Sequence, residues 1–261
     1  MLIDIVSDLH VDYWKTYPYD WSVGKKSDYV IIAGDISDHL SDVVRELKKA
    51  CGIYKDVLYV EGNHESSYYM NDLYYANNYI NKEMSSYSNF NNLSNTCFIK
   101  DDVAFIGACG WWDFNIYKPS VSIKEGIDCF NTSWNTLRSL SKREIVDNII
   151  NAAQRDAINI QEKIIALKKK YKICLVLHTV PHKDLISKKY PVNENEKSHY
   201  GNSIIQSIIE NEDSVKYVVF GHNHDSCFEK YMLSKLFINN ARGRPKDYNR
   251  RNYYPLQINI S

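Results

Sequence analysis

Short groups of aspartate, asparagine and histidine residues recur along the chain, and each group follows a run of apolar residues. The groups are Asp8-Leu9-His10, Gly34-Asp35, Gly62-Asn63-His64-Glu65, His178 and Gly221-His222-Asn223-His224. Carboxylate, amide and imidazole groups are ligands for divalent cations. Because this set mixes oxygen and nitrogen donors and has no thiolate, it suits Mn, Fe or Zn better than a closed structural zinc site. The groups therefore predict a metal site.

Each group taken alone has an ordinary structural explanation. Asp8 and His10 could end a strand, Asp35 could cap a helix, and Asn63 could lie in a turn. So many coincidences in order along one chain are very improbable, and we therefore prefer the metal-site interpretation. In it, Asp35 bridges two cations, while His64 donates a proton to a leaving oxygen or stabilises charge on a phosphoryl group.

The elements that must position these residues follow from the apolar runs. Runs too short for helices, ended by Gly, Asp or His, predict strands buried on both faces. They lie at Leu2–Val6, Tyr29–Ala33, Val57–Val60, Val103–Ile106, Ile173–Leu177, Val215–Phe220 and Leu256–Ile260. Helical spacing predicts helices at Ser41–Cys51, Ile149–Lys170 and Asn202–Glu210. Strands that alternate with helices indicate an α/β sheet covered on both faces, with its sites at the carboxyl ends of strands.

Length and composition predict an ordinary globular protein. We treat residues 1–261 as one domain with a cap or insertion at about 113–147, where aromatic residues mix with polar turns. Lys+Arg and Asp+Glu are both 32, so net charge gives no reason to expect nucleic acid or a membrane as partner. The chain shows no signal peptide or membrane-spanning run, which predicts a cytoplasmic protein. Its six scattered cysteines predict reduced thiols.

The order of these polar groups, from Asp8 to His224, resembles the signature of the calcineurin-like metallophosphoesterases. The resemblance implies a four-layered α/β/β/α sandwich with a dinuclear metal centre, and it places His64 near the leaving group. It also implies the metal ligands, which are Asp8, His10 and His224 for one ion, Asn63, His178 and His222 for the other, and Asp35 as the bridge.

Two further segments are similar to a bacterial and phage-type subgroup of that family. The subgroup usually has a Trp-x-Asp-Phe segment and an Asn-Pro-Arg-Gly-Tyr segment. This chain has Trp111-Trp112-Asp113-Phe114 and Asn240-Ala241-Arg242-Gly243, so Ala241 replaces the proline, and Arg244 stands where the tyrosine would be. We therefore infer no subgroup-specific substrate, and a viral or phage origin is left open.

The predicted reaction is hydrolysis of a phosphate ester. Two cations, Mn²⁺ first with Fe, Zn or Ni as alternatives, would lower the pKa of a bridging water and give a hydroxide that attacks phosphorus in line. A phosphodiester is slightly preferred, because an acid at the leaving group helps most when the departing alkoxide is poor. A nucleotide or cyclic nucleotide is a candidate substrate. The candidate substrate-binding residues are Asn63, His64 and Arg242.

Two alternative functions stay open at this point. The first alternative is a metal-dependent nuclease. In it, the basic residues between positions 242 and 251 would bind the phosphates of a nucleic-acid strand, and Tyr248, Tyr253 and Tyr254 would stack on its bases. The balanced net charge speaks against this alternative. A non-catalytic scaffold on the same fold is the other one. Such a protein would be expected to lose ligands, whereas here every ligand position is filled. The oligomeric state is left open.

Overall fold

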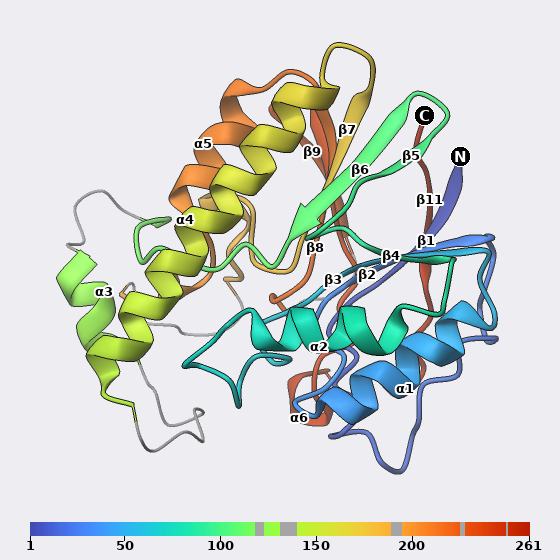
Figure 1. The fold of residues 1–261 in the computed structure, drawn as a ribbon, viewed down its shortest axis with the longest axis horizontal. Coiled ribbons are helices and arrows are strands. Elements are labelled where there is room, and N and C mark those ends of the chain that lie inside the picture. The colour runs from blue at the N-terminus through green and yellow to red at the C-terminus, as the bar shows by residue number, and fades with distance from the viewer. Residues whose placement is uncertain (118–122, 131–139, 189–194, 225–227, 249) are drawn as a thin grey trace.

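The computed structural model describes residues 1–117, 123–130, 140–188, 195–224, 228–248 and 250–261. Within them the strands form two sheets that pack face to face, and helices cover the outer face of each sheet (Figure 1). The layers follow one another as helix, sheet, sheet and helix. The structure therefore confirms the predicted four-layered α/β/β/α sandwich.

The first sheet has five strands in the order β11-β1-β2-β3-β4. They are β1 (Leu2–Val6), β2 (Tyr29–Ala33), β3 (Asp56–Val60), β4 (Phe90–Asn92) and β11 (Leu256–Asn259). Strand β11 is antiparallel to β1, and the other neighbours are parallel. Because β1, β2 and β3 run in the same direction, their carboxyl ends meet at one edge of the sheet.

The second sheet has six strands in the order β5-β6-β7-β8-β10-β9. They are β5 (Phe98–Lys100), β6 (Val103–Ala108), β7 (Lys172–Leu177), β8 (Val215–Phe220), β9 (Phe228–Met232) and β10 (Lys235–Asn239). The four central strands are parallel, and β5 and β9 form antiparallel edges. The carboxyl ends of β6, β7 and β8 therefore also share one edge.

Alternating side chains of each central strand serve two different cores. In β2, Val30 and Ile32 pack against helices, whereas Ile31 and Ala33 pack between the two sheets. Side chains in a strand point to opposite faces in turn, so a strand that is covered on both faces needs apolar residues at every position. This arrangement explains why the strands appear in the sequence as unbroken apolar runs.

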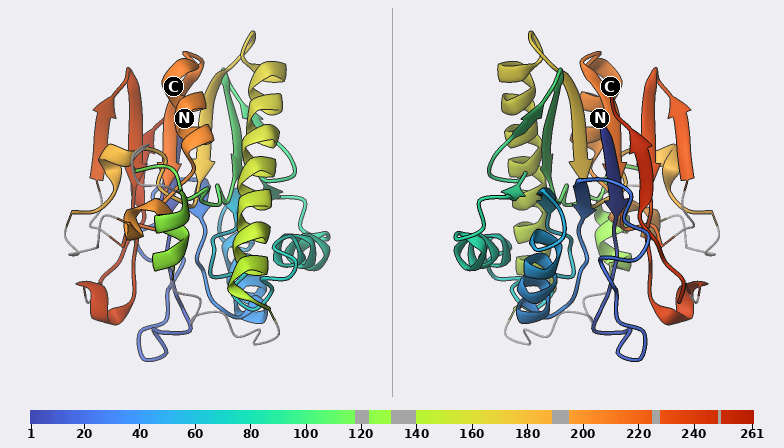
Figure 2. Two further views of the ribbon diagram at one scale, coloured as in Figure 1. Left: turned by 90° about the vertical axis from the view of Figure 1, so that its left-hand side faces the viewer. Right: turned by 90° about the vertical axis from the view of Figure 1, so that its right-hand side faces the viewer.

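Helices cover the outer faces of both sheets. Helices α1 (Leu40–Cys51) and α2 (Tyr75–Met84) cover the first sheet. Helices α4 (Lys142–Leu167) and α5 (Ser203–Asn211) cover the second. In both views of Figure 2, the long α4 stands beside strands of the second sheet. Among the described helices, none combines the length and apolar character that a membrane span requires.

The predicted strands and helices are all present; β1, β2 and β8 have the predicted ends, and the other predicted elements differ at one end or both. Helix α4 begins at Lys142, seven residues before the predicted start at Ile149. The reason is a capping box, in which the Ser141 hydroxyl accepts the Glu144 N–H and the Glu144 carboxylate accepts the Ser141 N–H. Sequence reasoning missed helix α2 and the strands β4, β5, β9 and β10. These elements are short or carry few apolar residues, so their periodicity is weak.

The predicted cap at about 113–147 contains helix α3 (Ile123–Cys129) and the first turn and a half of α4. Residues 118–122 and 131–139 of this segment lie outside the described residues. Phe114 and Phe130 pack with Ile145 and Ile149 of α4 in one apolar cluster. The assignment of the whole chain to one domain stays a prediction. Of the predicted thiols, the five described ones are free, and Cys227 lies outside the described residues.

Candidate metal centre

The polar groups found in the sequence lie in the loops that directly follow β1, β2, β3, β7 and β8. Backbone hydrogen bonds join these loops to one another. Asp8 N–H donates to the Gly34 carbonyl at 3.0 Å, and Gly221 N–H donates to the His178 carbonyl at 2.9 Å. The loops therefore form one surface at the edge where the carboxyl ends of both sheets meet.

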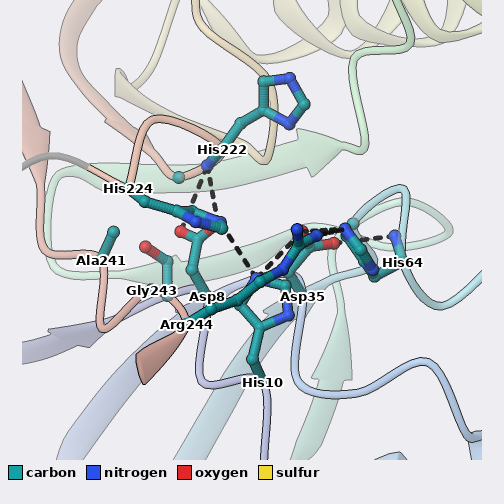
Figure 3. Close-up of polar contacts among 12 residues, drawn as sticks. Asp8, His10, Asp35, His64, His222, His224, Ala241, Gly243 and Arg244 are labelled. Carbon is teal, nitrogen blue, oxygen red and sulfur yellow. Dashed lines mark hydrogen bonds and ion pairs between the residues drawn. The ribbon is translucent and has the colours of Figure 1, made fainter. Parts of the chain in front are cut away.

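One set of donors comprises Asp8, His10, Asp35 and His224, and one ligand atom of each lies within 4.8 Å of the others. His10 Nε2 lies 3.0 Å from His224 Nε2, and His224 Nε2 lies 3.4 Å from Asp8 Oδ1. His10 Nε2 lies 3.8 Å from Asp35 Oδ2. Figure 3 shows these side chains converging from separate segments of the chain.

A second set of donors lies on the other side of Asp35. The Oδ1 atom of Asn63 is 3.1 Å from His178 Nε2 and 3.0 Å from His222 Nδ1. His178 Nε2 is also 3.3 Å from Asp35 Oδ2. The same carboxylate oxygen of Asp35 is therefore close to a histidine of each set.

The chemistry of these donors fits two divalent cations. Burial, with the charge of His64 next, holds the pKa of His10 well below its ordinary value, so its ring is neutral. Burial opposes ionisation of Asp35, but His178 and His64 outweigh it and hold the pKa of that carboxyl well below its usual range. A neutral imidazole and an ionised carboxylate are the forms that bind metal ions. Burial opposes protonation of His178 and His224, but Asp35 raises the pKa of His178 to about 10, and Asp247 with Asp8 raises that of His224 to about 9, so a cation that binds there displaces a proton.

The backbone at the site adopts conformations that side chains rarely permit. Asp8, His10, Asp35 and His222 have φ angles of 51°, 44°, 55° and 64°. Each non-glycine residue in this region costs about 1–3 kcal/mol, and such strain gathers at functional sites. Gly62 has a different role, since a Cβ atom there would lie 2.1 Å from Asp35 Oδ1. Only glycine allows that carboxylate its position.

Two of the four ligand histidine rings are oriented by groups outside the two donor sets. His178 Nδ1 donates to the Ala33 carbonyl at 2.9 Å, and His224 Nδ1 lies 2.5 Å from Asp247 Oδ2. These bonds fix each ring so that Nε2 faces the cluster, as partners of metal ligands do. Asp247, in the short helix α6 (Pro245–Tyr248), was missed by the sequence analysis because no local pattern marks it.

The sequence of this chain matches the family model of the calcineurin-like phosphoesterases over residues 1–256. The chain belongs to that family. The protein is therefore a metal-dependent phosphoesterase, and membership implies a centre of two divalent ions. Among the described residues, Asp8, His10, Asp35 and His224 form a cluster that could hold a metal ion.

A solved structure supports the fold of this phosphoesterase independently. The phosphopantetheinyl hydrolase (PptH) from Mycobacterium tuberculosis superposes with a TM-score of 0.78. It covers 99% of this chain and 96% of its own length at 16% sequence identity, a level at which the likeness concerns the fold alone. A search of the curated proteins found no significant match.

Glu65 joins two of the loops that carry ligands in this phosphoesterase. Its Oε2 accepts the N–H groups of Asp35 at 3.1 Å and Gly62 at 2.9 Å, and its Oε1 accepts the Ile36 N–H at 2.8 Å. Burial, and then the nearby Asp35, raises the pKa of Glu65 to about 7. The Gly-Asn-His-Glu pattern includes this residue, but only the structure shows that its carboxylate ties the loop after β2 to the loop after β3.

His64 stands between a carboxylate and a guanidinium in this phosphoesterase. Its Nδ1 contacts Asp38, and its Nε2 lies 2.6 Å from Arg244 Nη2 (Figure 3). Arginine is always a donor, so Nε2 of His64 accepts this bond and Nδ1 donates to Asp38. Burial opposes protonation, but Asp35 and Asp38 together raise the pKa of His64. Asp38 thus orients His64 much as Asp247 orients His224.

The structure does not bring Arg242 to the metal centre. Its side chain is 1% exposed, donates to the Tyr17 carbonyl at 2.6 Å and stacks 4.4 Å from the ring centre of Trp14. The prediction that Arg242 binds a substrate phosphate is corrected accordingly. Arg244 lies at the site instead, and it lines two cavities of 210 and 410 Å³ that open beside the metal ligands.

Proposed function

We propose that this phosphoesterase hydrolyses a phosphodiester at a dinuclear centre, with Mn²⁺ as the preferred ion and Fe, Zn or Ni as alternatives. The observation that supports two ions is the position of Asp35 Oδ2, which lies 3.8 Å from His10 Nε2 in one donor set and 3.3 Å from His178 Nε2 in the other. The proposed ligands are Asp8, His10 and His224 for one ion, Asn63, His178 and His222 for the other, and Asp35 as the bridge. When bound, such ions polarise the phosphoryl group and lower the pKa of an attacking water.

The remaining groups of the site act on the substrate. Arg244 takes the role predicted for Arg242, because its guanidinium reaches the cavity beside the metal ligands and can bind two phosphate oxygens at once. Nε2 of His64 is occupied by Arg244 at 2.6 Å. His64 therefore serves the departing oxygen only after the substrate draws the guanidinium away and Nε2 takes up a proton from solvent, which the raised pKa of His64 favours. Asp38 keeps the ring in place during that exchange.

The preference for a diester rests on this arrangement. His64 can protonate a departing alkoxide, and an acid at this position helps most when that alkoxide is a poor leaving group. A small diester such as a cyclic nucleotide is favoured over nucleic acid. Two residues of the nuclease alternative are turned inward, since Tyr253 is 5% exposed and Arg250 donates to the Ala241 carbonyl. The side chain of Tyr248 lies outside the described residues.

The test compares two chromogenic substrates. Protein stripped of metal with a chelator is supplied singly with Mn, Fe, Zn, Ni or Mg, and hydrolysis of bis-p-nitrophenyl phosphate and p-nitrophenyl phosphate is followed. We expect metal-dependent turnover, highest with Mn²⁺, that favours the diester. Preference for the monoester would overturn the diester proposal. No turnover with any metal, in protein that binds two equivalents, would contradict the proposed function.

The role of Arg244 has its own test. Arg244→Ala is expected to raise KM for bis-p-nitrophenyl phosphate more than it lowers kcat, because the guanidinium binds the phosphate before reaction. Lys246→Ala is the matched control, since this neighbouring side chain is exposed and lines neither cavity. An unchanged KM in Arg244→Ala would remove Arg244 from the substrate site.

A further inference from the structure

A cavity of 410 Å³ continues from the metal centre into a region lined by aromatic rings. At one end it shares Asn63, His64, His222 and Arg244 with the centre. The walls also carry the rings of Trp112, Phe130, His199 and Tyr200, of which Tyr200 lines the smaller cavity at the metal ligands as well. The volume lies within the range of small-molecule sites, about 300–1,000 Å³. A group attached to a phosphate at the metal centre would extend between these rings.

One wall of this aromatic cavity is held rigidly. Trp112 is 3% exposed, and its ring lies 5.9 Å from that of Phe130 in an edge-to-face arrangement. The loop that carries Trp112 is fixed to helix α4, because Asp156 Oδ2 accepts the N–H groups of Gly110 at 2.8 Å and Trp111 at 3.1 Å. A ring held in this way provides contact area without a large entropy cost on binding.

Another part of the lining comes from a different segment of the chain. Tyr200 directly follows the 3₁₀ helix η2 (Glu196–His199), and its ring lies 5.5 Å from that of His222 at a steep angle. The side chain of Asn202 donates to the Trp111 carbonyl at 2.9 Å and so joins the two walls. The aromatic cavity is therefore assembled by segments that pack against each other and against a metal ligand.

Charged groups distinguish the two ends of the aromatic cavity. Arg244 lines this cavity and also the smaller cavity at the metal ligands, whereas Glu196 lines only the aromatic one. This distribution suits a ligand with three parts. A phosphate would lie near Arg244, a planar ring would lie against the aromatic lining, and a hydrogen-bond donor on that ring would face Glu196.

We infer that the aromatic cavity is a subsite for a planar ring carried by the substrate, so that the substrate class is a phosphodiester of an aromatic or nucleobase-bearing alcohol. The inference rests on the proposed function, and it adds that diesters with a planar ring bind more tightly than diesters without one. Its structural basis is the continuity of the cavity with the metal centre through His64, His222 and Arg244. Ring stacking contributes about 1–3 kcal/mol per base in nucleic-acid sites, so a clear preference is expected.

The test measures binding without turnover. Mn²⁺-loaded protein is titrated calorimetrically with phenylphosphonate and methylphosphonate, which share the phosphonate group and differ in the ring. We expect phenylphosphonate to bind about tenfold more tightly or better. Tyr200→Ala and Trp112→Leu should bring the ratio of the two affinities near one, and Tyr200→Phe should retain it. Tyr231→Ala is the control, because this tyrosine is 72% exposed on β9 and lines no part of the cavity.

The role of Glu196 is tested with one further probe. 4-Aminophenylphosphonate carries a donor on the ring, so Glu196→Gln should weaken its binding several-fold and leave phenylphosphonate binding within twofold. Glu229→Gln, on the exposed side of β9, should change neither affinity. If Glu196→Gln weakens the binding of both probes equally, Glu196 does not accept a hydrogen bond from the amino group on the ring.

The outcomes separate the subsite from the proposed function. Equal affinity for phenylphosphonate and methylphosphonate in the unaltered protein would overturn the subsite, even if bis-p-nitrophenyl phosphate is hydrolysed. A preference that survives in folded, metal-loaded Tyr200→Ala and Trp112→Leu proteins would also overturn it. A ring preference that depends on Tyr200, in protein that hydrolyses neither chromogenic substrate, would support the subsite and contradict the phosphodiesterase.

Discussion

The metal centre and the aromatic cavity touch each other, yet the chain builds them in different ways. Each ligand of the centre stands in a loop directly after a parallel strand, on backbone that is often strained, as at Asp8 and His222. In the aromatic cavity only Trp112 follows a parallel strand, β6, whereas Phe130 follows α3, His199 ends η2 and Tyr200 follows η2. The loops at the strand ends thus carry the proposed metal ligands, and the connecting segments carry most of the residues proposed to select the substrate.

The largest effect is expected where both donor sets depend on one atom. Asp35→Asn removes the charge of the carboxylate that approaches His10 and His178, so both ions should bind poorly and turnover should fall by at least about 10³-fold. Metal content by plasma mass spectrometry and hydrolysis of bis-p-nitrophenyl phosphate measure the two effects. Glu229→Gln, the same change on an exposed strand, is the control. A fully loaded and active Asp35→Asn protein would remove the bridge from the proposal.

A smaller effect is expected at the boundary between the two regions. His64→Ala should keep both metal ions, because His64 belongs to neither donor set, and should lose turnover by roughly 10²–10⁴-fold. The loss should be greater for a poor leaving group than for p-nitrophenolate. Metal loss in His64→Ala would mean that the role of His64 is wrongly assigned. His39→Ala is the control, since that exposed histidine lies close by without lining either of the two cavities.

The same contrast explains what could be predicted from the sequence. A strand covered on both faces is apolar throughout, so the first polar residue after it marks the strand end, and His178 and Asp35 were found in this way. Arg242 could not be placed, because it lies outside a strand. The chain pairs with Ser7 at Ala241 and then turns at Gly243 with a φ of 71°. The alternation of side chains along a strand therefore does not continue through this segment, and it could not show that Arg244 lies at the site and Arg242 does not.

Residues that orient the histidines from distant parts of the chain are not marked by any local sequence pattern. Asp38 and Asp247 orient His64 and His224 from segments that come near these rings only in the folded chain. The aromatic cavity was equally hidden, since Tyr200 and Trp112 are far apart in sequence. The Trp-x-Asp-Phe segment was noticed as a resemblance, but its position beside the metal centre depends on packing against α4.

An effect below that of His64→Ala is expected at Asp247, which supports the centre from outside. Asp247→Asn weakens the bond that orients His224 Nε2, and removing such a partner typically costs 10–100-fold in metal affinity or activity. Metal titration of the stripped protein measures this loss directly. Asp184→Asn is the control, because this exposed carboxylate lies outside both donor sets. Unchanged metal affinity in Asp247→Asn would show that packing alone orients His224.

The smallest effect concerns a carboxylate that supports the aromatic cavity and not the metal centre. Asp156 is 6% exposed, and burial, with Glu61 next, raises its pKa from 3.8 to about 7. Because the folded state binds this proton more tightly than the unfolded state, the contribution of Asp156 to stability is fully present below about pH 4 and is lost as the pH rises through about 7. Asp156→Asn should remove that dependence.

The unfolding free energy of the unaltered protein should therefore fall relative to that of Asp156→Asn between pH 5 and pH 8, by about 1–3 kcal/mol. Urea denaturation at both pH values measures the difference. Asp147→Asn, an exposed carboxylate on the same helix, should show none of it. Because Asp156 holds the loop of Trp112, its replacement should also weaken phenylphosphonate binding while the metal content stays constant. Loss of metal in Asp156→Asn would show that the two regions are not independently supported.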